Sequence, residues 1–105
     1  MTISTTTLST TIANVYNSTS GNSAITSLTI CNYSPGNVQI NLYVVPANGT
    51  PGTATVALAN LNLTSEDTYQ LYAAAEKLLL GPNDYLAANA SANTAATVIV
   101  SSTTL

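Results

Sequence analysis

Residues 38–45, with the sequence VQINLYVV, carry the feature that most constrains the fold, an alternation of apolar and other side chains with a period of two. The apolar side of this segment holds Val38, Ile40, Leu42 and Val44. Because successive side chains of a strand point to opposite faces, this spacing predicts a half-buried strand of an antiparallel sheet.

The preceding segment, AITSLTICN at residues 24–32, repeats the alternation, with Leu28 and Ile30 on one face. The sequence NYSPGN joins the two segments, and in it Pro35 fixes φ while Gly36 tolerates a positive φ. These properties suit a tight reversal between neighbouring strands. We therefore predict a β-hairpin made of residues 24–32 and 38–45.

Further short β patterns, separated by turn residues, occupy most of the remaining chain. A longer loop is expected over residues 46–54, which contain two prolines and two glycines, and a polar turn over residues 64–67. Beyond the predicted hairpin, strands are expected in segments 3–17 (two short strands or one kinked strand), 56–63, 68–72, 76–80, 85–91 and 94–102.

The last two of these segments are expected to form a second hairpin. In it Leu86, Ala88 and Ala90 would face inward from one strand, and Val98 and Val100 from the other.

Residues 72–80, YAAAEKLLL, form the one ambiguous stretch, because Ala, Glu, Lys and Leu favour helices. A helix here would have only about two turns before Gly81-Pro82, and a helix that short is marginal without tertiary support. We favour a loop at residues 73–75 followed by a strand at 76–80, and a helix stays open as the alternative.

Seven or eight strands with no major helix predict an all-β fold, an antiparallel β-sandwich of jelly-roll-like form. A length of 105 residues corresponds to a single domain, residues 1–105. We expect its terminal segments, about residues 1–20 and 94–105, to engage neighbouring subunits, because Thr-rich strands at chain ends can be added to another sheet.

Charge excludes several classes of partner. The chain has one Lys or Arg and four Asp or Glu, so 5% of its residues are charged, against about 25% in average domains. Phosphate contacts need Lys and Arg, so neither nucleic acid nor an anionic membrane is expected as a partner. The surface instead relies on 18 Thr, 12 Asn and 11 Ser, and such a neutral domain tends to associate. Neither a signal peptide nor a membrane-spanning helix is expected.

Candidate catalytic groups are few, because the chain has no His. Glu66 and Asp67 are neighbours in a predicted turn, and their expected role is solvation, with calcium binding together with Asp84 as the alternative. Glu76 and Lys77 are expected to form a surface or intersubunit ion pair. We expect no catalytic residue, no metal site and no cofactor, and hence no enzyme.

Two kinds of side chain remain as candidates for binding. Cys31 lacks a neighbouring base and is expected to be a small buried apolar group. All the aromatic residues are tyrosines, which suit either protein interfaces or sugar stacking, and we favour an interface. The candidate interface residues are Tyr16, Tyr33, Tyr43, Tyr69, Tyr72 and Tyr85.

The Thr-rich runs near the two ends, STTTLSTT and SSTTL, also permit an ice-binding hydroxyl array. Such an array needs a regular T-x-T repeat over several strands, and these runs lack one. We therefore favour strand addition to a neighbouring subunit for the same segments.

Three segments together resemble small β-sandwich virion proteins of tailed bacteriophages, including phages of cyanobacteria. AITSLTICNYSPGNVQINLYVVP is similar to their ITSI-x-x-CN strand and the alternating strand after it. TSEDTYQLY is similar to their turn before a short strand, and KLLLGPNDYLAANAS to a K-x-x-L-x-x-G-D-x-(I/L) hairpin. The chain departs from this pattern at Pro82-Asn83 and in the shortened spacer YAAAEK.

This resemblance implies a non-enzymatic structural protein of the virion, made in the host cytoplasm. Its expected role is a capsid decoration or cement protein that forms a symmetric homo-oligomer and contacts other virion proteins such as the major capsid protein. The alternatives are a neck, tail, fibre or baseplate component, or a carbohydrate-binding module for receptor recognition.

Overall fold

The structure, a computed structural model, describes residues 2–19, 21–71 and 78–104, and within these ranges the chain is all-β with no helix. The strands are β1 (Thr2–Thr7), β2 (Ala13–Asn17), β3 (Ser23–Asn32), β4 (Val38–Val45), β5 (Val56–Leu63), β6 (Thr68–Leu71), β7 (Leu78–Leu80), β8 (Tyr85–Ala90) and β9 (Ala96–Thr104). These nine strands fill eight positions in the sheets, because β6 and β7 both pair with β3.

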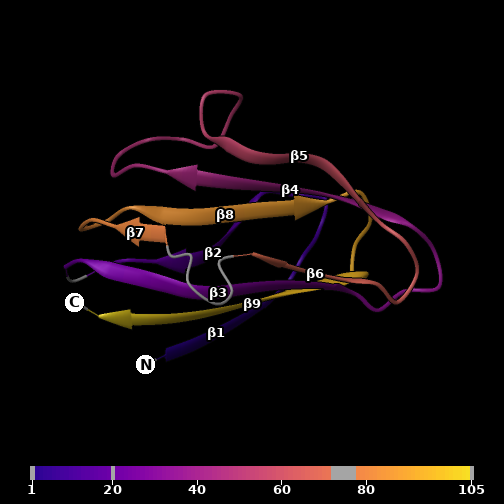
Figure 1. Cartoon of the computed structure of the whole chain (residues 1–105). Coiled ribbons are helices and arrows are strands. Elements are labelled where there is room, and N and C mark those ends of the chain that lie inside the picture. Colours follow the sequence, from indigo (N-terminus) through magenta and orange to yellow (C-terminus); the bar gives the residue numbers. More distant parts are fainter. Residues whose placement is uncertain (1, 20, 72–77, 105) are drawn as a thin grey trace.

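The strands form two antiparallel sheets that pack as a sandwich (Figure 1). Sheet A has the order β1-β9-β3-β6, with β7 also paired to β3, and sheet B has the order β2-β8-β4-β5. The chain crosses between the sheets at most of its connections, and β1, from the start of the chain, lies beside β9, from its end. This order is that of a jelly roll, so the predicted fold class is confirmed.

The predicted hairpins are wrong. β3 and β4 lie in different sheets, as do β7 and β8, and β8 and β9. Sheets of a sandwich are about 10 Å apart, whereas strands in one sheet are about 4.8 Å apart, so residues 33–37 form a corner across the core. Period-two alternation shows which face is buried, but it does not tell whether the next strand lies beside the first or opposite it. Among the described strands, β4 and β5 are the pair of consecutive strands that hydrogen-bond to each other. The long loop predicted at residues 46–54 connects them.

The core lies between the sheets. It includes every side chain that the alternation of residues 24–32, 38–45 and the last two strands predicts to face inward. Its buried members are Leu8, Val15, Ile25, Leu28, Ile30, Val38, Ile40, Leu42, Leu63, Leu80, Leu86, Ala88, Ala90, Ala95, Ala96, Val98 and Val100. Val44 packs against this cluster from the end of β4. Val45 is also buried, on the other face of β4, where a Cβ atom built on Gly49 would lie 3.2 Å from its Cγ1.

A β-bulge at Asn60 shifts the alternation of β5. Asn60 has φ of 54°, a conformation that Asn adopts more readily than most residues, and its backbone N–H donates to Oδ1 of Asn41 at 2.8 Å. The register of β4 against β5 shifts at the same place, between Leu58 and Leu61 on β5. This bulge explains why Leu58 does not continue in phase to Leu61 and Leu63, and a second register shift separates Leu58, which pairs with Leu42, from Val56, which pairs with Tyr43.

A buried amide organises the corner that joins the two sheets. Asn32, at the end of β3, is 0% exposed, and its Nδ2 donates to the backbone carbonyls of Gly36, Leu63 and Thr64 at 2.8, 3.0 and 3.0 Å. Its Oδ1 accepts from the backbone N and the Oγ of Ser34. Asn32 therefore ties the β3–β4 corner to the β5–β6 turn, which lies 31 to 32 residues further along the chain.

The ambiguous segment is a strand where the structure describes it, since β7 covers Leu78–Leu80 as predicted. The predicted loop at residues 73–75 and the start of the strand at 76–77 lie outside the described residues. In the described part of the chain no helix is long and apolar enough to span a membrane.

Candidate functional site

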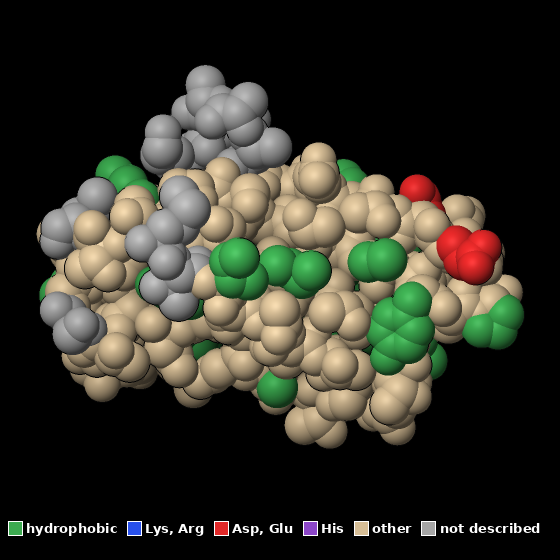
Figure 2. Space-filling model, turned by 90° about the horizontal axis from the view of Figure 1, so that it is seen from below, with side chains coloured by type: hydrophobic (Ala, Val, Ile, Leu, Met, Phe, Trp, Pro, Cys, Tyr) green, Lys and Arg blue, Asp and Glu red, His purple; other side chains and the backbone are tan. Residues whose placement is uncertain are grey.

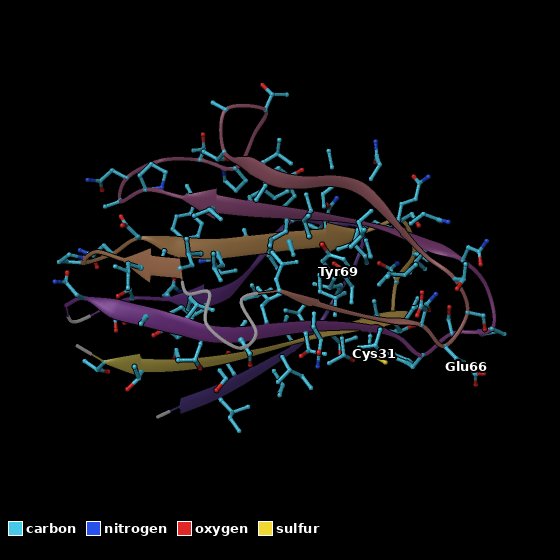
Figure 3. The ribbon with its side chains drawn as sticks, viewed as in Figure 1. Cys31, Glu66 and Tyr69 are labelled. Atoms are coloured by element: carbon cyan, nitrogen blue, oxygen red, sulfur yellow. The ribbon has the colours of Figure 1, made fainter. Side chains whose placement is uncertain are left out.

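The described carboxylates lie at opposite ends of the sandwich. Glu66 and Asp67 are exposed in the β5–β6 turn, at the end where Figure 3 labels Glu66, and Asp84 lies in the β7–β8 turn at the other end (Figures 1 and 3). Within residues 2–19, 21–71 and 78–104, no three His, Cys, Asp or Glu side chains gather as metal ligands would. The predicted ion-pair residues, Glu76 and Lys77, lie outside these ranges.

Asp84 has a structural role in its turn. Its Oδ2 accepts the backbone N–H of Gly81 at 2.8 Å, and its Oδ1 accepts the backbone N–H of Ala47 at 2.8 Å. The carboxylate therefore joins the β7–β8 turn to the start of the β4–β5 loop.

The candidate interface tyrosines are dispersed over the molecule. Tyr16 on β2 and Tyr85 on β8 are half-buried and donate hydrogen bonds, to Ser23 Oγ at 3.1 Å and to Gly49 O at 2.9 Å respectively. Tyr69 of β6 packs against the core, on the inward side of its strand (Figure 3). These three side chains therefore have internal partners.

The other candidate tyrosines differ in exposure. Tyr33 is 49% exposed in the β3–β4 corner. Tyr43 is half-buried on β4 and lines a shallow hollow of about 240 Å³ together with Asn41, Gly52, Thr53, Val56 and Ala59. Tyr72 lies outside the described residues.

Within the outer face of sheet A, side chains of β1, β9 and β3 form a neutral surface that we call the hydroxyl face, and the exposed Leu79 of β7 lies beside it. Thr and Ser dominate it, and its residues are Ile3, Thr5, Thr7, Ser27, Thr29, Cys31, Thr97, Ile99, Ser101 and Thr103. Pairing places them in rows across the strands, such as Thr7, Thr97 and Cys31, or Thr5, Ile99 and Thr29. The Thr-rich runs from the two ends of the chain therefore meet in one surface, although the rows lack a regular T-x-T repeat.

Cys31 is half-buried on this outer face (Figure 3), so the prediction of a buried apolar group is wrong. The alternation of β3 turns Cys31 away from the core, because its neighbours Ile30 and Asn32 face inward.

Charge is confined to one part of the sequence, since the first charged residue of the chain is Glu66. Figure 2 views the molecule from below, the side on which β1 and β9 lie in Figure 1. Neutral polar atoms dominate this view, hydrophobic side chains form small separate groups, and acidic side chains lie only toward one end. A partner docking on the hydroxyl face would therefore displace water mainly from hydroxyl and methyl groups.

The edge of sheet A at β1 differs from the other sheet edges. Edge strands are usually protected from pairing by bulges, shortness, charge or proline. β2 and β5 are bulged, and β6 and β7 are only four and three residues long. β1 pairs with β9 over six residues without a register shift and contains no charge, Pro or Gly. The sequence pattern does not reveal this edge as a distinct site, because the position of a strand at an edge depends on the order of all the strands in the sheet.

The terminal segments have different surroundings in the sheet. β9 lies between β1 and β3 and hydrogen-bonds to both of them, whereas β9 is the one neighbour of β1 among the described strands. Of these two terminal strands, β1 is therefore the one with an edge at which the expected strand addition to a neighbouring subunit could occur.

Comparison with known proteins adds no family assignment. No protein-family model matches the chain, and no curated protein matches it.

Proposed function

We propose that the protein is a non-enzymatic structural protein of a bacteriophage particle, a capsid decoration or cement protein that assembles as a symmetric homo-oligomer. The observation that supports this proposal most directly is the neutral hydroxyl face next to the unprotected β1 edge. Jelly rolls are widely used in viral capsid proteins, and the sequence resemblance described above gives the assignment to phages.

Assembly through such a surface is physically favourable. A buried charge has to lose its hydration, and this desolvation can exceed the gain from an ion pair. Hydroxyl groups carry a smaller penalty and can find partners across an interface. Specific interfaces bury about 1,200–2,000 Å² in total, and a surface without net charge allows copies to approach that closely without repulsion.

The non-enzymatic part of the proposal is supported by where the acidic groups lie. General acid–base catalysis needs groups within hydrogen-bond reach of one substrate. Glu66 and Asp67 are separated from Asp84 by the length of the sandwich, and both Asp84 oxygens bond to backbone N–H groups. These positions suit turn stabilisation.

The first experiment is a measurement of molecular mass by light scattering, near neutral pH and in moderate salt. A stable trimer, pentamer or hexamer would support a capsid or ring position, and a dimer would support assembly in pairs. A well-behaved monomer over the accessible concentration range would contradict the building-block function.

The virion assignment needs a separate measurement. Mass spectrometry of density-banded phage particles from the source culture should detect the chain at a copy number comparable to that of the capsid protein. Absence from such particles would contradict the assignment, whereas a few copies per particle would favour a neck, tail or fibre position.

One observation favours the alternative of a carbohydrate-binding module. The hollow at Tyr43 combines an aromatic ring with the amide of Asn41 and the hydroxyl of Thr53, groups that can stack on and hydrogen-bond to a sugar. On a glycan array, Tyr43→Ala should abolish binding of any glycan that wild type retains. Tyr33→Ala, which changes an exposed tyrosine outside this hollow, is the matched control.

A further inference from the structure

We propose that two copies of the chain join through antiparallel pairing of β1 with β1 of the second copy, centred on Thr5. This inference rests on the proposed homo-oligomer and specifies its contact. It begins with the direction in which the backbone groups of β1 point.

The pairing of β1 with β9 leaves every second residue of β1 open at the edge. Leu8 N donates to Ala96 O at 2.8 Å, so this pair follows the same register as β1 and β9 and is hydrogen-bonded. Hydrogen-bonded and non-hydrogen-bonded pairs alternate in an antiparallel ladder. The N–H and C=O groups of Ile3, Thr5 and Thr7 therefore point away from β9.

These six groups are self-complementary. In an antiparallel pairing centred on Thr5, Ile3 lies opposite Thr7 of the second copy, Thr5 opposite Thr5, and Thr7 opposite Ile3. Each pair exchanges two hydrogen bonds, so all six groups of each copy are used in six intermolecular bonds. The register follows from a two-fold axis through Thr5, which makes the contact isologous and closed.

Side chains favour the same arrangement. Ile3, Thr5 and Thr7 all lie on the hydroxyl face, and Ile3, at 69% exposure, would pack beside the Thr7 methyl group of the second copy. The charged groups that the structure describes do not oppose the approach, because Glu66 and Asp67 lie in the β5–β6 turn and Asp84 in the β7–β8 turn, both away from β1.

A hollow beside this edge would also be covered. It measures about 380 Å³ and lies between the edges of the two sheets, lined by Ile3, Ser4, Thr6, Asn14, Val15, Tyr16 and Asn17. Ser4 Oγ donates to Val15 O at 3.1 Å across it, so β1 is held in place before any partner arrives. Pairing through β1 brings the corresponding hollows of the two copies toward each other and adds contact area from β2.

Disulfide trapping tests the register directly. Opposed residues of a hydrogen-bonded pair have Cα atoms about 5.5 Å apart, within the range of about 4.4–6.8 Å that a disulfide spans. In a Cys31→Ser background, Thr5→Cys should form a covalent dimer on mild oxidation, which a reducing agent separates. Ile99→Cys is the matched control, because Ile99 pairs with Thr5 one strand further in and is also exposed. Equal cross-linking of both variants, or none at Thr5→Cys, would overturn the proposed register.

A second pair of variants tests the backbone bonds. Thr5→Pro removes an outward N–H and leaves the bonds from β1 to β9 in place, which is compatible with an edge strand. Thr5→Val keeps this N–H. A two-fold contact joins copies in pairs, so the wild-type chain should contain an even number of copies, and a trimer or pentamer would overturn the β1 contact. Light scattering should show half of the wild-type mass for Thr5→Pro and an unchanged mass for Thr5→Val, with the same far-ultraviolet circular dichroism.

The outcomes separate this inference from the proposed function. If the wild-type chain is an oligomer, but Thr5→Pro keeps its mass and Thr5→Cys does not cross-link, the β1 contact is wrong and the oligomeric function stands. If the wild-type chain is a monomer and Thr5→Cys does not cross-link, both proposals fail.

Discussion

Removal of the Asn32 side chain should destabilise the protein strongly, although the residue lies at a corner and not in the aliphatic core. Asn32→Ala deletes the donor to the buried carbonyl of Leu63 and four further hydrogen bonds in partly buried positions. An unpaired buried polar group costs about 1–3 kcal/mol, and a typical hydrogen bond contributes about 0.5–1.5 kcal/mol. Because water can reach the outer part of this corner, we expect a total loss of about 4 kcal/mol.

This loss is a large part of the stability of a domain of this size, which is about 5–15 kcal/mol. The measurement is urea unfolding followed by far-ultraviolet circular dichroism, with the transition midpoint compared at equal protein concentration and equal slope. Asn62→Ala, which removes an exposed amide on β5, is the matched control and should change the free energy of unfolding by less than about 0.5 kcal/mol.

A second variant separates the lost donor from the lost volume. Asn32→Asp keeps the shape of the side chain but replaces the Nδ2 donor by an oxygen facing three carbonyl oxygens. At neutral pH it should destabilise at least as much as Asn32→Ala. If the free energies of unfolding of both Asn32 variants lie within about 1 kcal/mol of the wild-type value, this amide does not hold the corner and the hydrogen-bond reasoning is refuted.

Three further predictions concern other positions. Leu42→Ala, in the centre of β4 at 0% exposure, should lower the free energy of unfolding by about 2–5 kcal/mol, and a change below 1 kcal/mol would mean that this part of the core collapses around the cavity. Asp84→Ala should lower the free energy of unfolding by about 1–3 kcal/mol, because two backbone N–H groups lose their acceptor. An unchanged midpoint of urea unfolding would mean that water replaces the carboxylate. Asn60→Gly should be neutral or stabilising by up to about 1 kcal/mol, because φ is positive at this position. Asn62→Gly in the same strand should destabilise the protein. Equal effects of the two substitutions on the melting temperature would contradict the bulge.

The strands were largely predictable from the sequence, but their neighbours were not. Alternation located β3 and β4 and identified Leu28, Ile30 and Ile40 as core residues, because burial of one face is a local property of a strand. The hairpin prediction failed because Pro35-Gly36 indicates only that the chain turns. A turn between sheets and a turn within one sheet use similar residues, and the buried contacts of Asn32 with a segment 31 residues away are invisible in the local pattern.

The candidate site shows the same division. The lack of charge before Glu66 is visible in the sequence and already points to a surface suited to association. Which strand lies at an open edge depends on the order of all the strands, and the bulges that protect β2 and β5 arise from pairing. Tyrosine content was a weaker guide, because Tyr16, Tyr69 and Tyr85 have partners inside the molecule.

The pairing of β1 with β9 also determines when the protein can finish folding during synthesis. Residues 2–7 leave the ribosome before their partners, residues 97–102, so β1 has no strand to pair with while the residues between them are made. During this interval an uncharged, β-branched segment is available to chaperones or to other nascent chains. A circular permutant that connects β9 directly to β1 would make this pair local, and it should therefore fold faster than the natural order of the strands.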